Sequence, residues 1–580
     1  MRSQRAPIRP HPRLQHLRVA MRAGQTLLLR GEGFFKIYFS VELILQIRYN
    51  TLTMKRVKKT ATFVATPKKP TMLIILDGFG LASAKNPGNA ITPGTAPYVF
   101  GLMKKYPNST LKTYGEHVGL FAHQQGNSEA GHMNIGAGRI VKQDLVQISE
   151  AIHDGTFYKN EAFKQALHHV KKYKTAVHVM GLLTDGNSAH AHPEHLYAML
   201  EYFRRNDVKK VYLHLFTDGR DSSPHGANSY LHELRGHMLA NEKIATVAGR
   251  FYAMDRNKIW ERTQMAYEAL VLGKGCTAPS AEEALAQSYN RGDTDEFICP
   301  TVIIENNHPT ATIKDNDAVF FINARSDRAR QITKAFVQDN FEAKNPGVFK
   351  RVHYPKNIRF VAMTDFGPDL PGLFTAFPSP DIQNCLPAVI DGAYRQLYIS
   401  ETEKYAHVTY FINGGFADPL NGEAREVVKS PPVRSYADQP EMNTKKLVEK
   451  IVGYLKKDTY NFICVNFPNP DMVGHTGDFS AGKKAIKIVD AGVKEIIGLL
   501  LKKNGQALII ADHGNAEEMI DLKTGEVDTE HSVNPVPCIL VGKNLGIKKI
   551  DNGILADVAP TLLKLMGVKK AREMTGKALI

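Results

Sequence analysis

The stretch TMLIILDGFG, residues 71–80, decides the fold class of this chain. Its apolar run contains two β-branched isoleucines and leads directly into Asp77 and Gly78. A short, continuous apolar run that ends in a glycine-containing loop is typical of a strand buried on both faces of a parallel sheet. We therefore expect the folded part of the chain to begin near residue 71 with such a strand.

The same pattern recurs later in the chain, between segments of helical periodicity. Three further apolar runs end in polar residues or closely follow them: FICVNFPNPD (462–471), ALIIADHG (507–514) and VPCILVG (536–542). Residues 481–503 repeat their apolar positions with the period of a helix. Alternating strands and helices predict an α/β fold with a mostly parallel sheet, in which ligands bind at the carboxyl ends of the strands.

A second set of apolar runs, with arginine-rich ends, lies between the members of the first set. These runs are VHVMGLLTDG (177–186), VYLHLFTDGRD (211–221), ATVAGRFYAMDR (245–256) and AVFFINARSDR (318–328). Because the first set brackets the second, we expect one α/β domain to be inserted into another. Linkers are expected near 140–145 and near 370–380, where Pro and Gly are frequent. The predicted domains are a discontinuous one at 71–142 and 376–580 and an inserted one at 143–375.

The bulk composition sets limits on the class of protein. A chain of 580 residues is too long for one ordinary core, which favours two large domains. Its 43% hydrophobic and 23% charged residues are typical of a soluble globular protein. The odd number of cysteines, with none spaced as in a metal knuckle, favours buried thiols in a reducing compartment over a disulfide framework. These cysteines are Cys276, Cys299, Cys385, Cys464 and Cys538.

The basic charge of the chain is concentrated at its N-terminus. Residues 1–70 hold fifteen Lys and Arg against Glu32 and Glu42, so they carry +13 of the formal net charge of +16. The remainder is nearly neutral, which argues against a nucleic-acid-binding body. This segment fits an untranslated or disordered extension with Met54 as the true start, an organelle transit peptide, or a nucleic-acid arm. Its apolar part, residues 34–47, is charged and too short to span a bilayer, and no other segment resembles a membrane span.

Polar residues at the ends of the first set of runs form a candidate two-metal site. They are Asp77, Asp471, His475, Asp512, His513 and His531. Mixed carboxylate and imidazole ligands suit zinc or manganese, and the sequence does not choose between them. Ser128 lies in QQGNSEAGHMNIGAGRIV (124–141), which is either a surface turn or a nucleophile loop that opens a helix. A two-metal site would activate that serine without a neighbouring base.

The second set of runs supplies a candidate anion-binding group. Its members are His190, Arg220, Asp221, Arg250, Arg256, Arg325 and Arg328. Arginine recognises carboxylate and phosphate through paired hydrogen bonds, so these residues indicate a substrate with several negative charges. The alternative is a surface laced with salt bridges. Lys404, after what reads as a helix-like run, is expected to reach the same cleft; alone it would more often be a solvated lysine.

These residues lie in motifs that resemble the cofactor-independent phosphoglycerate mutases of the alkaline phosphatase superfamily. The resemblance covers nearly all of residues 71–580. The motifs, in chain order, are LDGFG, QGNSEAGHMNIGAGRIV, TDGRD, GRFYAMDR, RSDRARQIT, EKYAHVTYFINGG, NPDMVGHTG, ADHGNAEEM and HSVNPVP. The nearest rivals are a phosphatase or phosphopentomutase of the same superfamily and an inactive scaffold with a basic leader.

The resemblance implies an alkaline-phosphatase-like domain interrupted by a second α/β domain that excludes water. It implies interconversion of 3-phosphoglycerate and 2-phosphoglycerate in glycolysis and gluconeogenesis, without 2,3-bisphosphoglycerate. It also implies a cytoplasmic monomer, or an organellar protein if the leader is a transit peptide, with no nucleic-acid or membrane partner. Activity is expected to fall on mild acidification, because metal ligands must be deprotonated.

The resemblance also implies a role for each matching residue. Ser128 would be the phosphorylated nucleophile. Two manganese ions are expected, with cobalt, zinc or magnesium as alternatives: one held by Asp77, Ser128, Asp512 and His513, the other by Asp471, His475 and His531. The substrate would be held by His190, Arg220, Asp221, Arg250, Arg256, Arg325, Arg328 and Lys404.

Two segments depart from the family pattern. DGNSAHAHPEHL (185–196) carries one extra residue. Counting back from its final HL makes His190 the family's histidine, with His192 as the alternative. After TDGRD the usual Pro-rich turn is replaced by SSPHGA, which alters a loop and spares Arg220 and Asp221.

Overall fold

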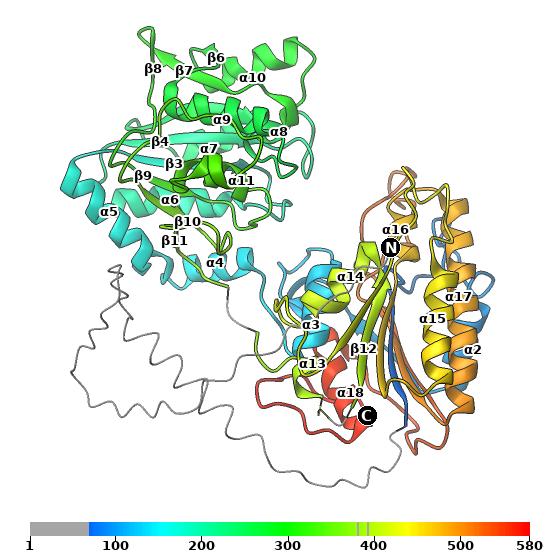
Figure 1. Cartoon of the computed structure of the whole chain (residues 1–580). Helices are drawn as coiled ribbons and strands as arrows, with labels where there is room; N and C mark the ends of the chain where they lie inside the picture. Colours follow the sequence, from blue (N-terminus) through cyan, green and yellow to red (C-terminus); the bar gives the residue numbers. More distant parts are fainter. Residues whose placement is uncertain (1–68, 380–381, 391, 393) are drawn as a thin grey trace, which may run out of the picture. The chain divides into compact units, whose positions relative to one another are not determined.

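The computed structural model describes residues 69–580 apart from 380–381, 391 and 393 (Figure 1). The basic leader and the alternatives predicted for it lie outside these residues. The described part folds into two separate, mostly parallel sheets with helices around them, which confirms the predicted α/β class. None of the described helices combines the length and hydrophobicity that a membrane span requires.

The first sheet is built around the strand predicted at residue 71. Its strand order is β13-β12-β14-β1-β15-β16-β2-β17, and β1 lies between β14 and β15, parallel to both. Strand β16 runs antiparallel to its neighbours β15 and β2, whereas β17 pairs parallel to β2, so the sheet is mixed at one side. The strands are β1 (Thr71–Leu76), β2 (Asn108–Lys112), β12 (Gln396–Glu401), β13 (Ala424–Val428), β14 (Phe462–Phe467), β15 (Gln506–Ile510), β16 (Val536–Gly542) and β17 (Gly553–Ile554).

Helices cover both faces of this sheet. Figure 1 shows α2, α15 and α17 along one face and α3, α13, α14 and α18 toward the other. Every side chain of β1 is buried, as expected for a strand covered on both faces. The helices are α2 (Pro97–Lys105), α3 (Ser128–Ala137), α13 (Leu386–Val389), α14 (Thr402–Ala406), α15 (Thr444–Lys456), α16 (Asn469–Gly474), α17 (Phe479–Lys502) and α18 (Val558–Met566).

The second sheet has the order β11-β10-β9-β3-β4-β5-β7-β6, with β8 paired to β7. Its strands are β3 (Val177–Leu183), β4 (Val211–Thr217), β5 (Glu242–Gly249), β6 (Cys276–Ala278), β7 (Thr301–Glu305), β8 (His308–Pro309), β9 (Ala318–Phe321), β10 (Arg359–Ala362) and β11 (Phe374–Thr375). Its helices are α4 (Asp144–His153), α5 (Glu161–Tyr173), α6 (Pro193–Arg205), α7 (Ala227–His237), α8 (Arg250–Ala253), α9 (Trp260–Leu272), α10 (Ala281–Asn290), α11 (Arg330–Val337) and α12 (Phe341–Lys344).

The positions of the strands in the sequence can be compared with the predicted insertion of one domain into the other. All strands of the second sheet come from residues 177–375, whereas the first sheet draws on 71–112 and 396–554. The two faces of the second sheet have separate cores: Val179 packs into one and Met180 into the other. This arrangement supports the proposed insertion of residues 143–375 between the two parts of the other domain.

A chain of buried polar groups crosses the second sheet. His178 on β3 contacts His214 on β4 through ring nitrogens 2.9 Å apart, and His214 contacts Thr246 on β5, also at 2.9 Å. The far nitrogen of His178 lies 3.2 Å from the carboxylate of Asp317. Burial and the neighbouring His178 hold the pKa of His214 well below its usual range, so this imidazole is neutral.

Glu401, at the end of β12, carries a prediction about stability. The side chain is buried and accepts a hydrogen bond from the Asn443 amide at 2.9 Å. Burial raises its pKa from 4.5 to about 7. Between these two values the unfolded chain is ionised while the folded protein keeps its proton, so the glutamate's contribution to stability falls as pH rises. We expect Glu401→Gln to raise the free energy of unfolding at pH 8 by about 1–3 kcal/mol, measured by denaturant titration.

The matched control for this substitution is Glu449→Gln, because Glu449 is exposed on α15. The difference between wild type and Glu401→Gln should shrink as pH falls toward 4.5, whereas Glu449→Gln should change little at any pH. A Glu401→Gln variant that is less stable than wild type at pH 8 would contradict the prediction.

Candidate functional site

Ser128 is the first residue of α3, and the local sequence explains its position. The Asn127 side chain caps the helix by accepting a hydrogen bond from the Ala130 amide at 2.8 Å. Gly136 lets the helix lie against the backbone of the 407–412 segment, since a Cβ there would stand 2.0 Å from the Ile412 carbonyl oxygen. Ser128 itself is 6% exposed and is held at the carboxyl ends of the first sheet's strands.

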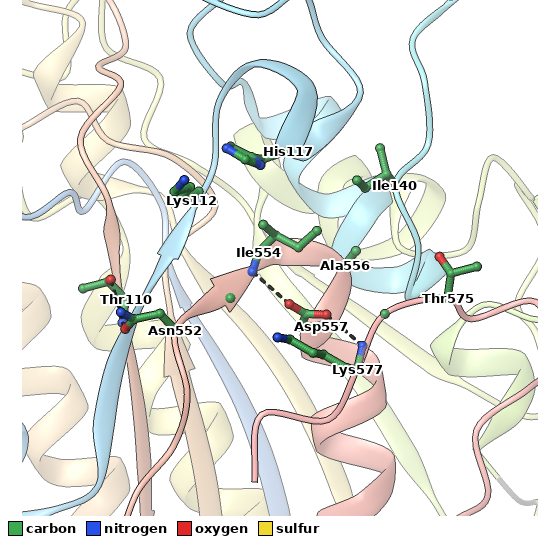
Figure 2. A pocket seen from close by; sticks show the side chains of 12 residues that line it. Thr110, Lys112, His117, Ile140, Asn552, Ile554, Ala556, Asp557, Thr575 and Lys577 are labelled. Carbon is green, nitrogen blue, oxygen red and sulfur yellow. Dashed lines mark hydrogen bonds between the residues drawn. The ribbon is translucent and has the colours of Figure 1, made fainter.

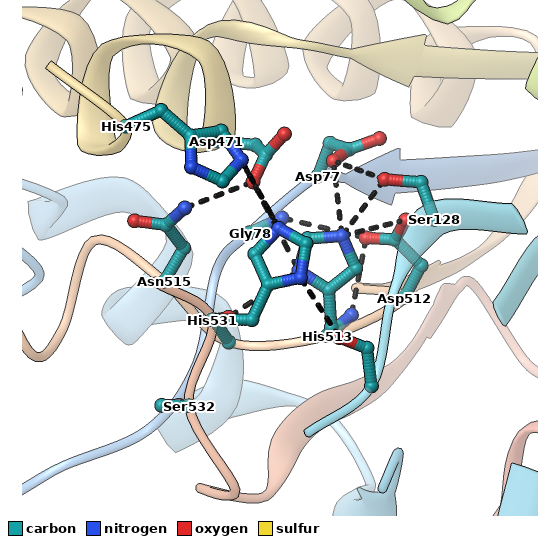
Figure 3. Close-up of polar contacts among 12 residues, drawn as sticks. Asp77, Gly78, Ser128, Asp471, His475, Asp512, His513, Asn515, His531 and Ser532 are labelled. Atoms are coloured by element: carbon teal, nitrogen blue, oxygen red, sulfur yellow. Dashed lines mark hydrogen bonds and ion pairs between the residues drawn. The ribbon is translucent and has the colours of Figure 1, made fainter. Parts of the chain in front are cut away.

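The Ser128 hydroxyl lies within a dense polar cluster (Figure 3). Its oxygen is 2.8 Å from Nε2 of His513 and 2.5 Å from Nζ of Lys404. Asp77 is 3.4 Å from the same oxygen, through Oδ1. Ligand atoms of Asp77, Asp512 and His513, all three fully buried, lie close enough together to share one cation. The four residues predicted for the first metal therefore lie together.

The three residues predicted for the second metal also converge. Oδ1 of Asp471 is 3.3 Å from Nε2 of His475 and 3.2 Å from Nε2 of His531, and these two nitrogens are 3.1 Å apart. The Nδ1 atoms of the two histidines face the carbonyl oxygens of Thr529 and Gly126 at 2.7 and 2.8 Å. If each Nδ1 donates its proton there, both Nε2 lone pairs point at one another and at the carboxylate. Such a set of donors fits a divalent cation.

The charges in this cluster support the same interpretation. Nζ of Lys404 lies 2.8 Å from Asp77 and 2.7 Å from Asp471. Although burial opposes its charge, these carboxylates hold the pKa of Lys404 above its usual range. Burial, with the adjacent charge of Asp512, raises the pKa of Asp77 to about 7. One lysine therefore does not neutralise three buried carboxylates, and the remaining negative charge favours bound cations.

Several buried residues support the predicted ligands and were missed by the sequence analysis. Asn466 on β14 donates to Oδ2 of Asp77 at 2.6 Å, and its amide nitrogen lies 3.0 Å from Nε2 of His132. Nδ1 of His132 lies 2.9 Å from the Ser128 carbonyl oxygen and 3.2 Å from Asp512. Two signals were available: His132 follows Ser128 by one helical turn, and Asn466 interrupts an otherwise apolar strand.

The local structure before Lys404 differs from the expectation, although Lys404 lines the same cavity as Arg325. It was predicted to join the arginines after a helix-like run, but the run before it is strand β12, and Lys404 lies on the short helix α14 beside Ser128. The prediction of a helix-like run is therefore wrong. The physical reason is that β12 pairs with β14, whose end leads to Asp471, so the residues after β12 reach the same edge of the sheet.

The predicted anion-binding residues form a second cluster around three carboxylates, Asp218, Asp221 and Asp327. Arg250 is almost fully buried and contacts Asp218 at 2.5 Å and Asp221 at 2.8 Å. Asp327 contacts Nη1 of Arg256, and its Oδ1 lies 3.2 Å from Nε of Arg325. The remaining arginines lie farther out: Arg220 is 3.5 Å from Glu296, and Arg328 donates to the Met254 carbonyl oxygen at 3.3 Å.

The structure distinguishes the two candidate histidines. His190 is 5% exposed, and its Nδ1 lies 3.9 Å from Asp327, inside the arginine cluster. Burial, then the charge of Arg250, lowers its pKa to about 4, so the ring is neutral at pH 7. The ring of His192 instead packs against Phe121, with centroids 5.0 Å apart. This geometry favours His190 as the histidine of the anion-binding cluster.

A cavity of about 930 Å³ opens onto Ser128. Its lining includes Lys404, Asp471, His475 and His531. Of the anion-binding set, only Arg325 lines this cavity among the described residues, and it also contacts Glu129, the neighbour of Ser128, at 3.0 Å. The structure therefore brings the predicted metal ligands and the predicted nucleophile together. It also brings the arginines together, and Arg325 makes contacts in both groups.

Arg250 carries a prediction about folding. Arg250→Ala would leave the buried carboxylate of Asp218 without its cation, and removal of one partner from a buried ion pair costs ~3–5 kcal/mol. We expect a loss of that size in the free energy of unfolding, measured by denaturant titration, with a smaller loss for Arg250→Lys. The control is Arg235→Ala, because Arg235 forms an exposed pair with Glu282, and it should cost below about 1 kcal/mol. Equal losses for the two alanine variants would contradict the prediction.

Comparisons with a family model, with related sequences and with solved structures all give the same family. The family model described as BPG-independent PGAM N-terminus matches residues 148–368. A 2,3-bisphosphoglycerate-independent phosphoglycerate mutase of Clostridium botulinum is 45% identical over 519 residues, covering 88% of this chain and 99% of its own. The enzyme of the same name from Chloroflexus aurantiacus is 46% identical over 538 residues, covering 89% and 99%. A crystal structure of Leishmania mexicana phosphoglycerate mutase at low cobalt concentration superposes with a TM-score of 0.69 at 28% identity, covering 89% of this chain and 98% of that one.

Proposed function

Because the chain belongs to the family of 2,3-bisphosphoglycerate-independent phosphoglycerate mutases, we propose that it interconverts 3-phosphoglycerate and 2-phosphoglycerate through a phosphorylated Ser128. The observation that carries this proposal is the position of the Ser128 hydroxyl, 2.8 Å from His513 and 2.5 Å from Lys404 at the N-terminus of α3. This mutase is an isomerase that acts in glycolysis and gluconeogenesis and needs no added 2,3-bisphosphoglycerate.

The phosphoryl group moves in two balanced transfers. In the first, Oγ of Ser128 bonds to phosphorus while the bond from phosphorus to the substrate oxygen breaks. The proton lost by the serine hydroxyl ends on that glycerate oxygen. In the second transfer the other glycerate hydroxyl attacks the phosphoserine, and its proton returns to Ser128. No net proton, water or phosphate is consumed, which is the balance that an isomerase requires.

The residues around Ser128 favour the transfer through fixed charge. Lys404 keeps its proton, because its pKa lies above the usual range despite burial. Its ammonium group therefore stays charged beside the reacting oxygen during both transfers, where it stabilises the negative charge that develops. Ser128 is the first residue of α3, so the positive end of the helix dipole favours a phosphoryl group there.

The two donor sets described above would hold two divalent cations. Asp77, Ser128, Asp512 and His513 would hold one, and Asp471, His475 and His531 the other. When bound, such cations lower the pKa of the serine hydroxyl and stabilise negative charge on the phosphoryl oxygens. We propose manganese, because carboxylate and hydroxyl oxygens outnumber imidazoles in the first set. Asn466 and His132 act as positioning residues that orient Asp77 and Asp512.

The arginine cluster would bind the glycerate. The five arginines of the cluster, Arg220, Arg250, Arg256, Arg325 and Arg328, outnumber its three carboxylates, Asp218, Asp221 and Asp327, which leaves cationic donors for an anion. Asp221 and His190 would complete the same site. We propose that these residues hold the substrate carboxylate while the molecule turns between the two transfers. Because a phosphoserine open to water would be hydrolysed, the inserted domain at 143–375 would exclude water during that step. The enzyme would act on small phosphoglycerates as a cytoplasmic monomer.

One assay tests the proposed reaction against its nearest rival. The full chain loaded with manganese is incubated with 3-phosphoglycerate, without 2,3-bisphosphoglycerate, and followed by ³¹P NMR. This measurement resolves 3-phosphoglycerate, 2-phosphoglycerate and inorganic phosphate. Accumulation of 2-phosphoglycerate to equilibrium supports the mutase. If inorganic phosphate accumulates instead, the chain is a metal-dependent phosphatase and the proposal fails.

A further inference from the structure

A second cavity of about 530 Å³ lies away from Ser128, at the edge of the first sheet (Figure 2). It is bounded by β2 and β17, the short helices η1 (Gly115–Val118) and η5 (Leu555–Asp557), and residues 575–577. Ile140, three residues beyond the end of α3, completes its rim. None of the residues that line it belongs to the metal-ligand or arginine clusters, so the proposed reaction leaves this cavity without a role.

The charged groups of this cavity are mainly cationic. Lys112 and Lys577 line it, and within the described part of the chain neither side chain forms an ion pair. His117 lies beside them, and burial together with the charge of Lys112 lowers its pKa. Thr110 and Asn552 add polar side chains to the same wall. Ammonium groups that line a cavity without an ion-pair partner attract an anion.

The one carboxylate in the lining is already satisfied by backbone donors. Asp557 is 4% exposed and accepts hydrogen bonds from the Ile554 amide at 3.0 Å and the Lys577 amide at 2.8 Å. These two hydrogen bonds stabilise the carboxylate within the wall of the cavity. The same contacts fix the backbone from which the Lys577 side chain extends (Figure 2).

The wall is rigid, which favours a preformed site. The Gly576 amide donates to the Gly138 carbonyl oxygen at 2.9 Å, at the C-terminal end of α3. A Cβ at Gly576 would lie 2.1 Å from the Ala556 carbonyl oxygen, so the chain at this point is held against η5. Lys570 donates to the carbonyl oxygens of Met574 and Gly576 at 2.9 and 2.6 Å. These hydrogen bonds restrain the backbone just before Lys577.

The remaining lining is apolar. Ile140 is 41% exposed at the rim, and Ile554 and Ala556 also line the cavity. The volume lies in the range of small-molecule sites, which combine an apolar surface with a few polar anchors. We propose that this cavity binds a small organic phosphate, with the phosphate group between Lys112 and Lys577 and the organic part against Ile140 and Ile554. The proposal stands independently of the mutase reaction.

Calorimetric titration of the full, manganese-loaded chain tests this site. The probes are inorganic phosphate and adenosine 5′-monophosphate, compared between wild type and the double variant Lys112→Ala/Lys577→Ala. Binding of either probe at Ser128 is common to both proteins, so the difference between the isotherms reports the second cavity. We expect the variant to lose one equivalent of bound probe, or to bind it at least about tenfold more weakly.

The matched control is Lys543→Ala/Lys548→Ala, which removes two exposed lysines of the same domain outside the cavity. This control should keep the wild-type isotherm, and all three proteins should share one melting temperature. Tighter binding of adenosine 5′-monophosphate than of phosphate means that the organic part contributes; equal binding means that the phosphate group alone is recognised. Identical isotherms for wild type and the Lys112→Ala/Lys577→Ala variant, or equal losses in both double variants, would overturn the proposal.

Discussion

Replacing Ser128 with alanine is expected to lower kcat for phosphoglycerate interconversion at least ~10⁴-fold, to the limit of detection. Both transfers require a bond between Oγ of Ser128 and phosphorus, so no slower version of the same route remains. The substitution removes one oxygen that contacts His513 and Lys404 and leaves the buried carboxylates in place. Substrate binding should therefore change far less than kcat.

A direct readout separates the nucleophile from a merely structural serine. Rapid denaturation during turnover of ³²P-labelled 3-phosphoglycerate should trap label on the peptide that contains Ser128 in wild type and none in the variant. The matched control is Ser480→Ala, because Ser480 is exposed on α17, and it should keep wild-type turnover. Label on a different peptide, or turnover above about one per cent of wild type in Ser128→Ala, would refute the assignment.

Removal of divalent cations is the second change expected to abolish activity. Dialysis against a chelator should eliminate turnover, and added manganese should restore it, because the serine hydroxyl then loses the charges that make it nucleophilic. The apparent melting temperature should fall as well, since three buried carboxylates would keep only Lys404 as a strong positive partner. The control is the same chelator saturated with manganese beforehand. Full turnover after exhaustive chelation would contradict the prediction.

The pH dependence of metal binding follows from the same cluster. In the metal-free protein burial raises the pKa of Asp77 to about 7, and Asp471, despite the opposing cost of burial, raises the pKa of His475. Protons therefore compete for ligand atoms as pH falls through about 7, and manganese affinity should decrease over that window. Titration of manganese by electron paramagnetic resonance at pH 6 and pH 8 measures this. Equal affinities would refute it.

Most of the proposed metal ligands could be identified in the sequence because they closely follow an apolar run, whereas His531 precedes one. A run of that kind predicts a buried strand, parallel strands end at one edge of the sheet, and the next polar residue is therefore placed there. Asp77 and Asp512 illustrate the rule, since β1 and β15 are paired and parallel. The likeness of the surrounding motifs to a known family then supplied a role for each position, which the spacing alone did not.

Other parts of the site depend on contacts that no local pattern encodes. Strand β12 before Lys404 was not recognised, and its pairing with β14 brings Lys404 to Ser128. Asp327 contacts Arg256 and Arg325 from its own loop, yet an aspartate between arginines reads equally well as a solvated loop residue. Such partners are set by tertiary packing, where neighbours are separated by tens or hundreds of residues.

The buried chain from Asp317 through His178 and His214 to Thr246 has a consequence for strand alignment. A bulge after Leu213 places His214 directly opposite Thr246, and each link of the chain needs one donor facing one acceptor. If the carboxylate of Asp317 accepts from His178, all other protons along the chain are fixed in order. A slip of one residue between β3, β4 and β5 would turn these side chains to the opposite face and bury them unpaired. The hydrogen bonds of these histidines thus favour the observed register of β3, β4 and β5 over pairings shifted by one residue.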